Sequence, residues 1–148
     1  MSAPRLSLTV QYAVPAEGLP TRQRLRRWAA AAAERDCAVT LRIVDEEEGR
    51  ALNRDFRGKD YPTNVLTFVY EDGGTLQGDI ALCAPVIARE AHEQGKTGLA
   101  HWAHLVVHGM LHLQGYDHED DAQAAVMERR ETQIVTELGY PDPYRSSA

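Results

Sequence analysis

The segment from Gly98 to Gln114 constrains the fold of this chain more than any other part of its sequence. Apolar side chains and four histidines occupy almost every side of the helix predicted here, which leaves it no polar face. A helix of this kind is buried, so the rest of the chain has to pack around it. Because 43% of the 148 residues are hydrophobic, such a core needs no disulfide or structural metal.

The preceding sequence predicts a small sheet on which this helix can pack. Alternating apolar residues predict two half-buried strands, near residues 6–12 and 39–43. The segments NVLTFVY and GDIALC predict two more strands, because both are rich in the residues that strands favour. The short turn EDGG joins these last two, so we expect them to form an antiparallel hairpin.

Capping and helix-breaking residues predict the remaining helices. Thr21 after Pro20 begins one helix, Asp45 with Glu48 forms a capping box for a second, and Pro85 begins a third. A last helix follows the acidic residues 119–121 and ends at Gly139. The order is therefore strand, helix, strand, helix, hairpin and three helices.

This order predicts an α+β (mixed α/β) fold. We expect a small four-stranded mixed sheet, a central histidine-bearing helix packed on it, and surrounding helices. The sequence contains no repeat and no linker that would divide it, so a single domain over residues 1–148 is predicted.

Three histidines within HGMLHLQGYDH, residues 108–118, predict a metal site. His108 and His112 are four residues apart, so a helix directs both imidazoles the same way, as two ligands of one zinc ion require. Gly115 can take the left-handed conformation that ends a helix, which allows the chain to turn and bring His118 to the same ion. Three protein ligands leave a fourth position for water, which is typical of a catalytic rather than a structural zinc. We therefore expect one Zn²⁺ per chain and a hydrolytic reaction.

Two other histidines lie on the same stripe of the predicted helix. Geometry also allows a pair formed by His104 and His108, but only His108 and His112 lie next to the turn at Gly115. We expect His104 to support the site from behind or to belong to the core.

The spacing H-x-x-x-H-x-x-G-x-x-H is shared with the metzincin peptidases. Those enzymes carry a glutamate directly after the first histidine as the general base. Here that position is Gly109, which has no side chain to move a proton. A peptidase, or another hydrolase, would have to recruit a base such as Asp117 or Glu119. The sequence therefore favours a different hydrolytic reaction.

Beyond this motif, the chain resembles the bacterial YbeY-type endoribonuclease family of rRNA maturation factors. The matching blocks are LNRDFRGKDYPTNVLTF at 52–68, GDIALC at 78–83 and AHWAHLVVHGMLHLQGYDH at 100–118, with GYPDPY near the end. The resemblance implies a metal-dependent endoribonuclease that prefers single strands. It implies a role in rRNA maturation, chiefly at the small-subunit 3′ end, and in ribosome quality control. Single-stranded RNA, and the ribosomal small subunit or assembly factors, are the partners implied.

The resemblance also implies that the three histidines hold the metal and that Arg57 is a functional basic residue. The chemistry of Arg57 agrees, because a guanidinium offers planar, paired donors to phosphate oxygens that gain charge in the transition state. Arg54 and Lys59 could extend this contact along the RNA backbone.

Other polar residues have two interpretations each. Asn64 and Thr67 either line the cleft or only begin a strand. Asp79 and Asp117 are candidates for a proton carrier or an orienting group, and each could equally serve a turn or a cap. A further hypothesis for the whole chain is a non-enzymatic ribosome-assembly factor whose fold is stabilised by zinc. In that case, removal of the metal would unfold the protein.

Charge and composition limit the cellular context. The net charge is −6, yet residues 1–60 hold 11 of the 16 Lys and Arg against 9 acids, which gives this part a net charge of +2. This asymmetry suggests that RNA meets the face bearing Arg54 and Arg57. No apolar run approaches the roughly 18 residues that cross a bilayer, and no signal peptide is predicted. With two widely separated cysteines and no membrane segment, we expect a cytoplasmic protein.

Overall fold

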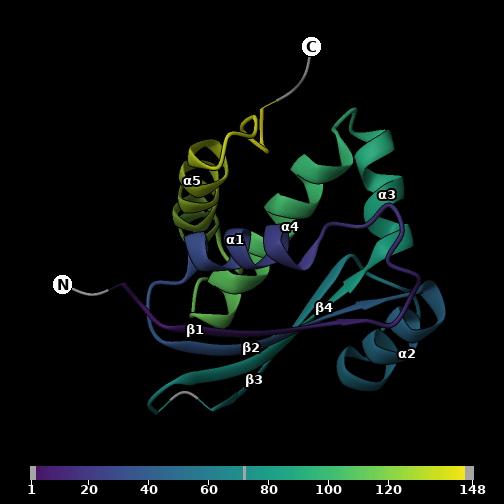
Figure 1. Ribbon diagram of the computed structural model, residues 1–148, viewed down its shortest axis with the longest axis horizontal. Helices are drawn as coiled ribbons and strands as arrows, with labels where there is room; N and C mark the ends of the chain where they lie inside the picture. The colour runs from purple at the N-terminus through teal and green to yellow at the C-terminus, as the bar shows by residue number, and fades with distance from the viewer. Residues whose placement is uncertain (1–2, 72, 146–148) are drawn as a thin grey trace.

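The computed structural model describes residues 3–71 and 73–145 (Figure 1). The predicted order of strands and helices is confirmed. In chain order the elements are β1 (Leu6–Tyr12), α1 (Arg22–Ala32), β2 (Cys37–Val44), α2 (Glu46–Arg57), β3 (Val65–Glu71), β4 (Leu76–Cys83), α3 (Ala84–Glu93), α4 (Gly98–Leu113) and α5 (Asp121–Glu137).

The four strands form one mixed sheet in the order β1-β2-β4-β3. β1, β2 and β4 are parallel, with Val39 of β2 opposite Gly78 of β4. β3 is antiparallel to β4, as expected of the hairpin, and forms an edge of the sheet. Insertion of β4 between β2 and β3 places the start of β3 beside α4, where the candidate site lies.

α4 is the central helix, as its sequence predicts. It contacts α1, α3, α5 and the sheet, and these helices gather around it on one side of the sheet (Figure 1). α2 lies at the end of the sheet, where it contacts β4 and α3. From His101 to Leu113 every residue of α4 is buried except His108 and His112, which are partly exposed. The only opening along this stretch of the helix is therefore at the two histidines.

Gly109 sets how closely α4 approaches the sheet. A Cβ added at this position would lie 3.1 Å from Cγ2 of Ile80 and 3.2 Å from its Cδ1, and Ile80 is fully buried in β4. The glutamate that metzincins carry at this point of the motif has no room here. Glycine in place of the metzincin glutamate therefore allows the close packing of α4 on β4, and it also removes the general base of the peptidases.

The helix ends follow the predicted capping with one correction. The side chains of Thr21, Asp45 and Asp120 each accept a hydrogen bond from a backbone N–H in the first turn of their helices. The capping box at Asp45 is only half formed, because the Glu48 carboxylate binds the Arg42 guanidinium instead of the Asp45 N–H. No helix in the described ranges is long and apolar enough to span a bilayer.

The close packing of β4 gives a test of the fold. A Cβ at Gly78 would lie 2.7 Å from the backbone oxygen of Phe68 and 2.9 Å from Cδ2 of Leu113. We expect Gly78→Ala to lower the free energy of unfolding by about 1–3 kcal/mol, since strand and helix must both shift. Urea denaturation measures this change. Gly98→Ala is the matched control, because nothing lies within 4 Å of the added Cβ; an equal loss in both variants would contradict the packing described.

Candidate functional site

The candidate site is a solvent-open cleft of about 640 Å³ between α2, the start of β3 and the end of α4. It brings together side chains from two stretches of the sequence, residues 53–67 and 108–119. The polar and charged lining residues are Asn53, Arg57, Lys59, Tyr61, Thr63, Asn64, Thr67, His108, His112, Asp117, His118 and Glu119.

The three predicted metal ligands lie together in this cleft. The ring centroids of His108 and His112 are 6.4 Å apart, with planes only 6° from parallel, as the four-residue spacing predicts. His118 lies 5.7 Å from His108 and 5.9 Å from His112. Gly115, with a φ of +105°, makes the turn that returns the chain, as expected from its place in the motif.

The hydrogen bonds of two rings leave the same nitrogen available on each. Nδ1 of His112 lies 3.0 Å from the backbone oxygen of Tyr116, and Nδ1 of His108 lies 3.3 Å from Oε2 of Glu131. Both partners are acceptors, so each Nδ1 donates, and in a neutral ring each Nε2 then keeps a lone pair. Burial, the largest influence, lowers the pKa of His112 and favours the neutral form that a metal ligand requires.

These residues fit a three-histidine metal site in type and orientation, although the rings are not fully drawn together. Imidazoles bound to one tetrahedral zinc have centroids on the order of 5 Å apart. Within residues 3–71 and 73–145, no three His, Cys, Asp or Glu side chains are yet close enough to enclose an ion. The widest separation is the 6.4 Å between His108 and His112, so binding one ion would require small movements of these two rings as well as of His118.

A buried carboxylate stands behind His108. Glu131 of α5 is fully buried, and its Oε1 lies 2.6 Å from Nε2 of His104 and 2.6 Å from the hydroxyl of Tyr144. Burial alone would raise the pKa of Glu131, but the hydrogen bonds from His104, His108 and Tyr144 lower it to about 2. The carboxylate is therefore charged and fixes the ring of His108.

Sequence reasoning missed Glu131 and Tyr144, although a signal was present. Glu131 lies on the buried stripe of α5 with Met127 and Ile134, where a charged side chain is rare unless it is paired. Tyr144 belongs to GYPDPY, a segment to which the family resemblance assigns no role. His104 contacts Glu131, which in turn contacts His108, and it does not line the cleft; this agrees with one of its two expected roles.

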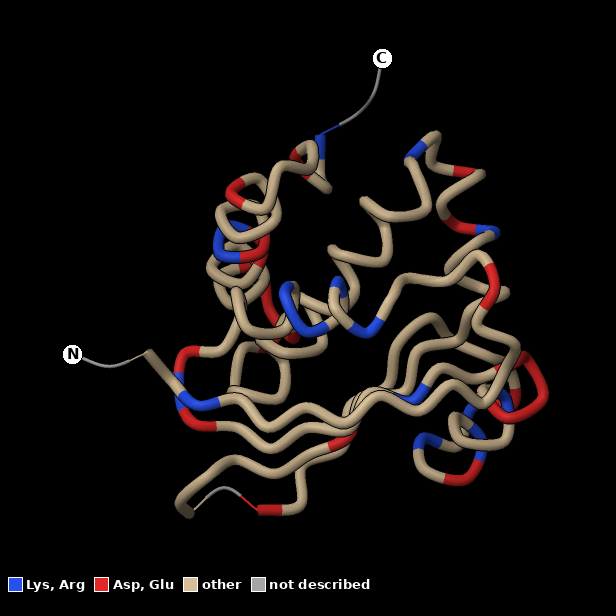
Figure 2. The backbone as a smooth tube through the Cα atoms, viewed as in Figure 1, with Lys and Arg blue, Asp and Glu red and all other residues tan. Residues whose placement is uncertain are grey.

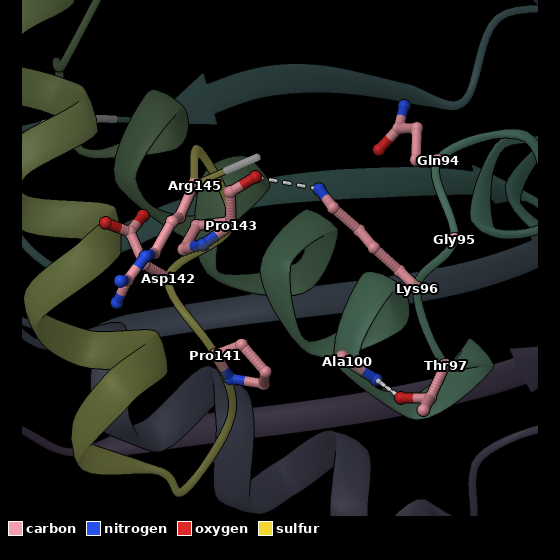
Figure 3. Close-up of a pocket in the computed structure, with 9 residues that line it drawn as sticks. All are labelled: Gln94, Gly95, Lys96, Thr97, Ala100, Pro141, Asp142, Pro143 and Arg145. Atoms are coloured by element: carbon pink, nitrogen blue, oxygen red, sulfur yellow. Dashed lines mark hydrogen bonds between the residues drawn. The ribbon is translucent and has the colours of Figure 1, made fainter. Parts of the chain in front are cut away.

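The segment that carries Tyr144 is fastened to the start of α4. Nζ of Lys96 donates a hydrogen bond of 2.8 Å to the backbone oxygen of Pro143, across a smaller pocket (Figure 3). Thr97 caps α4 at the same pocket by accepting a hydrogen bond from the N–H of Ala100. This contact helps to hold the Tyr144 hydroxyl on Glu131.

Of the predicted basic residues, Arg57 and Lys59 line the cleft and Arg54 does not. Nη2 of Arg57 lies 3.4 Å from the backbone oxygen of Thr67, which directs the guanidinium across the gap between α2 and β3. Arg54 instead forms an exposed ion pair with its neighbour Asp55.

The basic residues of the N-terminal part do not form one surface. Figure 2 shows them spread over α1, α2 and the strands and loops next to these helices. On α1, Arg22 and Arg26 donate to the backbone oxygens of Val10 and Leu8 in the edge strand β1. The charge asymmetry of the sequence therefore reflects structural contacts as well as the cleft.

The two carboxylates proposed as proton carriers differ in their position relative to the cleft. Asp79 accepts a hydrogen bond of 2.6 Å from the Tyr70 hydroxyl and does not line the cleft. Asp117 lines the cleft, as does Glu119, and its Oδ1 accepts a hydrogen bond from the backbone N–H of His118. Asn64 and Thr67 also line the cleft. They therefore lie near the start of a strand and are also accessible to a ligand.

The fold and the site define an α/β protein with three clustered histidines in an open, cation-bordered cleft. The sequence model of the family described as Endoribonuclease YbeY matches residues 20–139. The endoribonuclease YbeY of Methylobacillus flagellatus is 60% identical over 143 residues, covering 97% of this chain and 96% of that protein. That of Aromatoleum aromaticum is 59% identical, covering 95% of this chain and 93% of that protein.

A solved structure agrees with these sequence matches. The solution structure of TM1509 from Thermotoga maritima superposes with a TM-score of 0.63 at 30% identity, covering 88% of each chain. The chain belongs to the endoribonuclease YbeY family. Tyr144, which contacts Glu131, lies beyond the residues that the family model matches.

Replacement of the buried carboxylate tests the support of His108. We expect Glu131→Gln to weaken zinc binding about 10- to 100-fold, because an amide cannot accept from three donors and its own NH₂ opposes one of them. Isothermal titration with zinc measures the effect. Glu137→Gln removes the same charge from an exposed position of the same helix and serves as the control. Equal zinc affinity in both variants would mean that Glu131 does not support the site.

Proposed function

We propose that this protein is a zinc-dependent endoribonuclease that cleaves single-stranded RNA during rRNA maturation. The observation that carries the proposal is the presence of three converging imidazoles and the cations of Arg57 and Lys59 in one cleft. Its relatives are named endoribonucleases and match nearly the whole chain. The small-subunit 3′ end and ribosome quality control are the cellular roles included in this proposal.

In this proposal His108, His112 and His118 hold the metal. When bound, zinc supplies a Lewis acid and a water whose pKa is lowered to about 7. Arg57 binds phosphate oxygens and stabilises the negative charge that develops on them, since its guanidinium presents paired donors. Lys59 adds a second cation along the same wall of the cleft, and Asp117 and Glu119 are the carboxylates placed to accept or return a proton.

Single-stranded RNA suits this cleft better than a duplex. The bases of a duplex are hidden in its stack, whereas unpaired bases can turn outward and stack on aromatic rings. Tyr61 lines the cleft with 53% of its surface exposed, so its ring is available to such a base.

The cellular setting that we propose is the cytoplasm. Its support is that Cys37 and Cys83 are both buried with free thiols, as is usual in a reducing compartment. The ribosomal small subunit or assembly factors are the partners that a role in rRNA maturation would require.

The role of Arg57 can be separated from general charge by a matched pair of variants. We expect Arg57→Ala to reduce cleavage of a single-stranded rRNA-like oligonucleotide about 10²- to 10³-fold while zinc content stays at the wild-type level. Arg54→Ala removes the same charge from the same helix but outside the cleft, so it should cut nearly normally. Equal rates for Arg57→Ala and wild type would overturn the assignment.

Removal of the metal distinguishes the enzyme from a zinc-stabilised assembly factor. We expect a chelator to abolish cleavage while far-UV circular dichroism and cooperative thermal unfolding persist, because the core around α4 forms without the metal. Added zinc should restore activity, and His112→Ala should neither bind zinc nor cut. Unfolding of the protein on chelation would instead favour the non-enzymatic reading.

A further inference from the structure

The cleft has a polar wall that the proposed reaction does not use. Asn64, just before β3, lines the cleft, and its Nδ2 lies 3.0 Å from Oε1 and 3.3 Å from Oε2 of Glu90 on α3. On the other side of this carboxylate, Nε2 of His101 on α4 lies 2.9 Å from Oε1. Three elements distant in sequence thus meet at one carboxylate.

This arrangement fixes the direction of the Asn64 amide. A carboxylate only accepts hydrogen bonds, so the NH₂ group of Asn64 has to face Glu90 and its Oδ1 has to point away. Glu90 is held in turn by His101, which is 3% exposed and whose pKa is lowered chiefly by burial. The neutral ring places its single proton on Nε2, toward the carboxylate, and its buried Nδ1 has no partner in the described structure.

The remaining polar atom of Asn64 is a fixed acceptor at the cleft. No donor in residues 3–71 or 73–145 bonds to its Oδ1. Phosphate oxygens have no hydrogen to give, so this atom does not take the groups that Arg57 and Lys59 bind. On an RNA strand the sugar offers a hydrogen-bond donor at every nucleotide, the 2′-hydroxyl, which DNA lacks.

We propose that Asn64 accepts a hydrogen bond from a ribose 2′-hydroxyl, and that Glu90 and His101 are positioning residues that hold its amide in the accepting orientation. This inference rests on the proposed function, because it requires RNA in the cleft. It makes the cleft complementary to a ribose–phosphate strand, with donors on the wall of Arg57 for phosphate and an acceptor on the wall of Asn64 for the sugar.

Binding affinities for two oligonucleotides test this inference without reference to cleavage. One is a short single-stranded oligoribonucleotide, and the other has the same sequence with 2′-fluoro sugars, which keep the sugar conformation but cannot donate. By fluorescence anisotropy, we expect wild-type protein to bind the 2′-hydroxyl strand about three- to tenfold more tightly, the effect of one hydrogen bond. Asn64→Ala should lose this preference.

Glu90→Gln should lose most of the same preference, because glutamine can donate as well as accept and lets the Asn64 amide turn. Glu93→Gln, an exposed change of the same kind on the same helix, should keep it. Thermal unfolding of each variant shows that it is folded. One further variant, Arg57→Ala, compared with wild type at matched zinc content, separates phosphate binding from sugar binding.

The possible outcomes distinguish this inference from the proposed function. Wild-type protein that binds neither strand would overturn both. An unchanged preference in Asn64→Ala, or an equal loss of affinity for both strands, would overturn only the role of Asn64; an equal loss would indicate a base or backbone contact. Loss of preference in Asn64→Ala and Glu90→Gln, with affinity for the 2′-fluoro strand preserved, would support the inference.

Discussion

The burial of α4 is the constraint on which the rest of the structure depends. Its apolar circumference forces the sheet and three other helices to pack around it, and Gly109 lets it approach β4 closely enough to exclude solvent. Between His101 and Leu113 only His108 and His112 reach the surface. The candidate metal centre therefore lies where the core helix meets solvent, on a rigid element whose position is fixed by packing.

Burying a histidine-rich helix requires partners for its polar atoms, and the protein uses them to organise the cleft. Each of the two buried histidines meets an acid from a neighbouring helix, and each acid extends to a residue that lines the cleft. The two links are His101–Glu90–Asn64 and His104–Glu131–His108. The hydrogen bonds of these links position one wall of the cleft and one ring of the histidine cluster, while the buried Nδ1 atoms of His101 and His104 have no partner in the described residues.

Much of the fold could be predicted from the sequence because its signals are local. Strand alternation, the caps at Thr21 and Asp45 and the turn at Gly115 each depend on residues a few positions apart. The sheet order could not be predicted, because the insertion of β4 between β2 and β3 depends on contacts far apart in the sequence. The capping box failed for the same reason, since Arg42 of a neighbouring strand competes for Glu48.

The sequence by itself determined the histidine cluster. Four-residue helical spacing and a glycine turn bring His108, His112 and His118 together almost independently of the remaining fold. Only the tertiary structure decided that Arg57 and Lys59 share their cleft while Arg54 does not, and that Glu131 contacts His108. Arg57 and Glu131 reach the site from α2 and α5, and long-range packing, which has no signature in local spacing, brings these helices to α4 and β3.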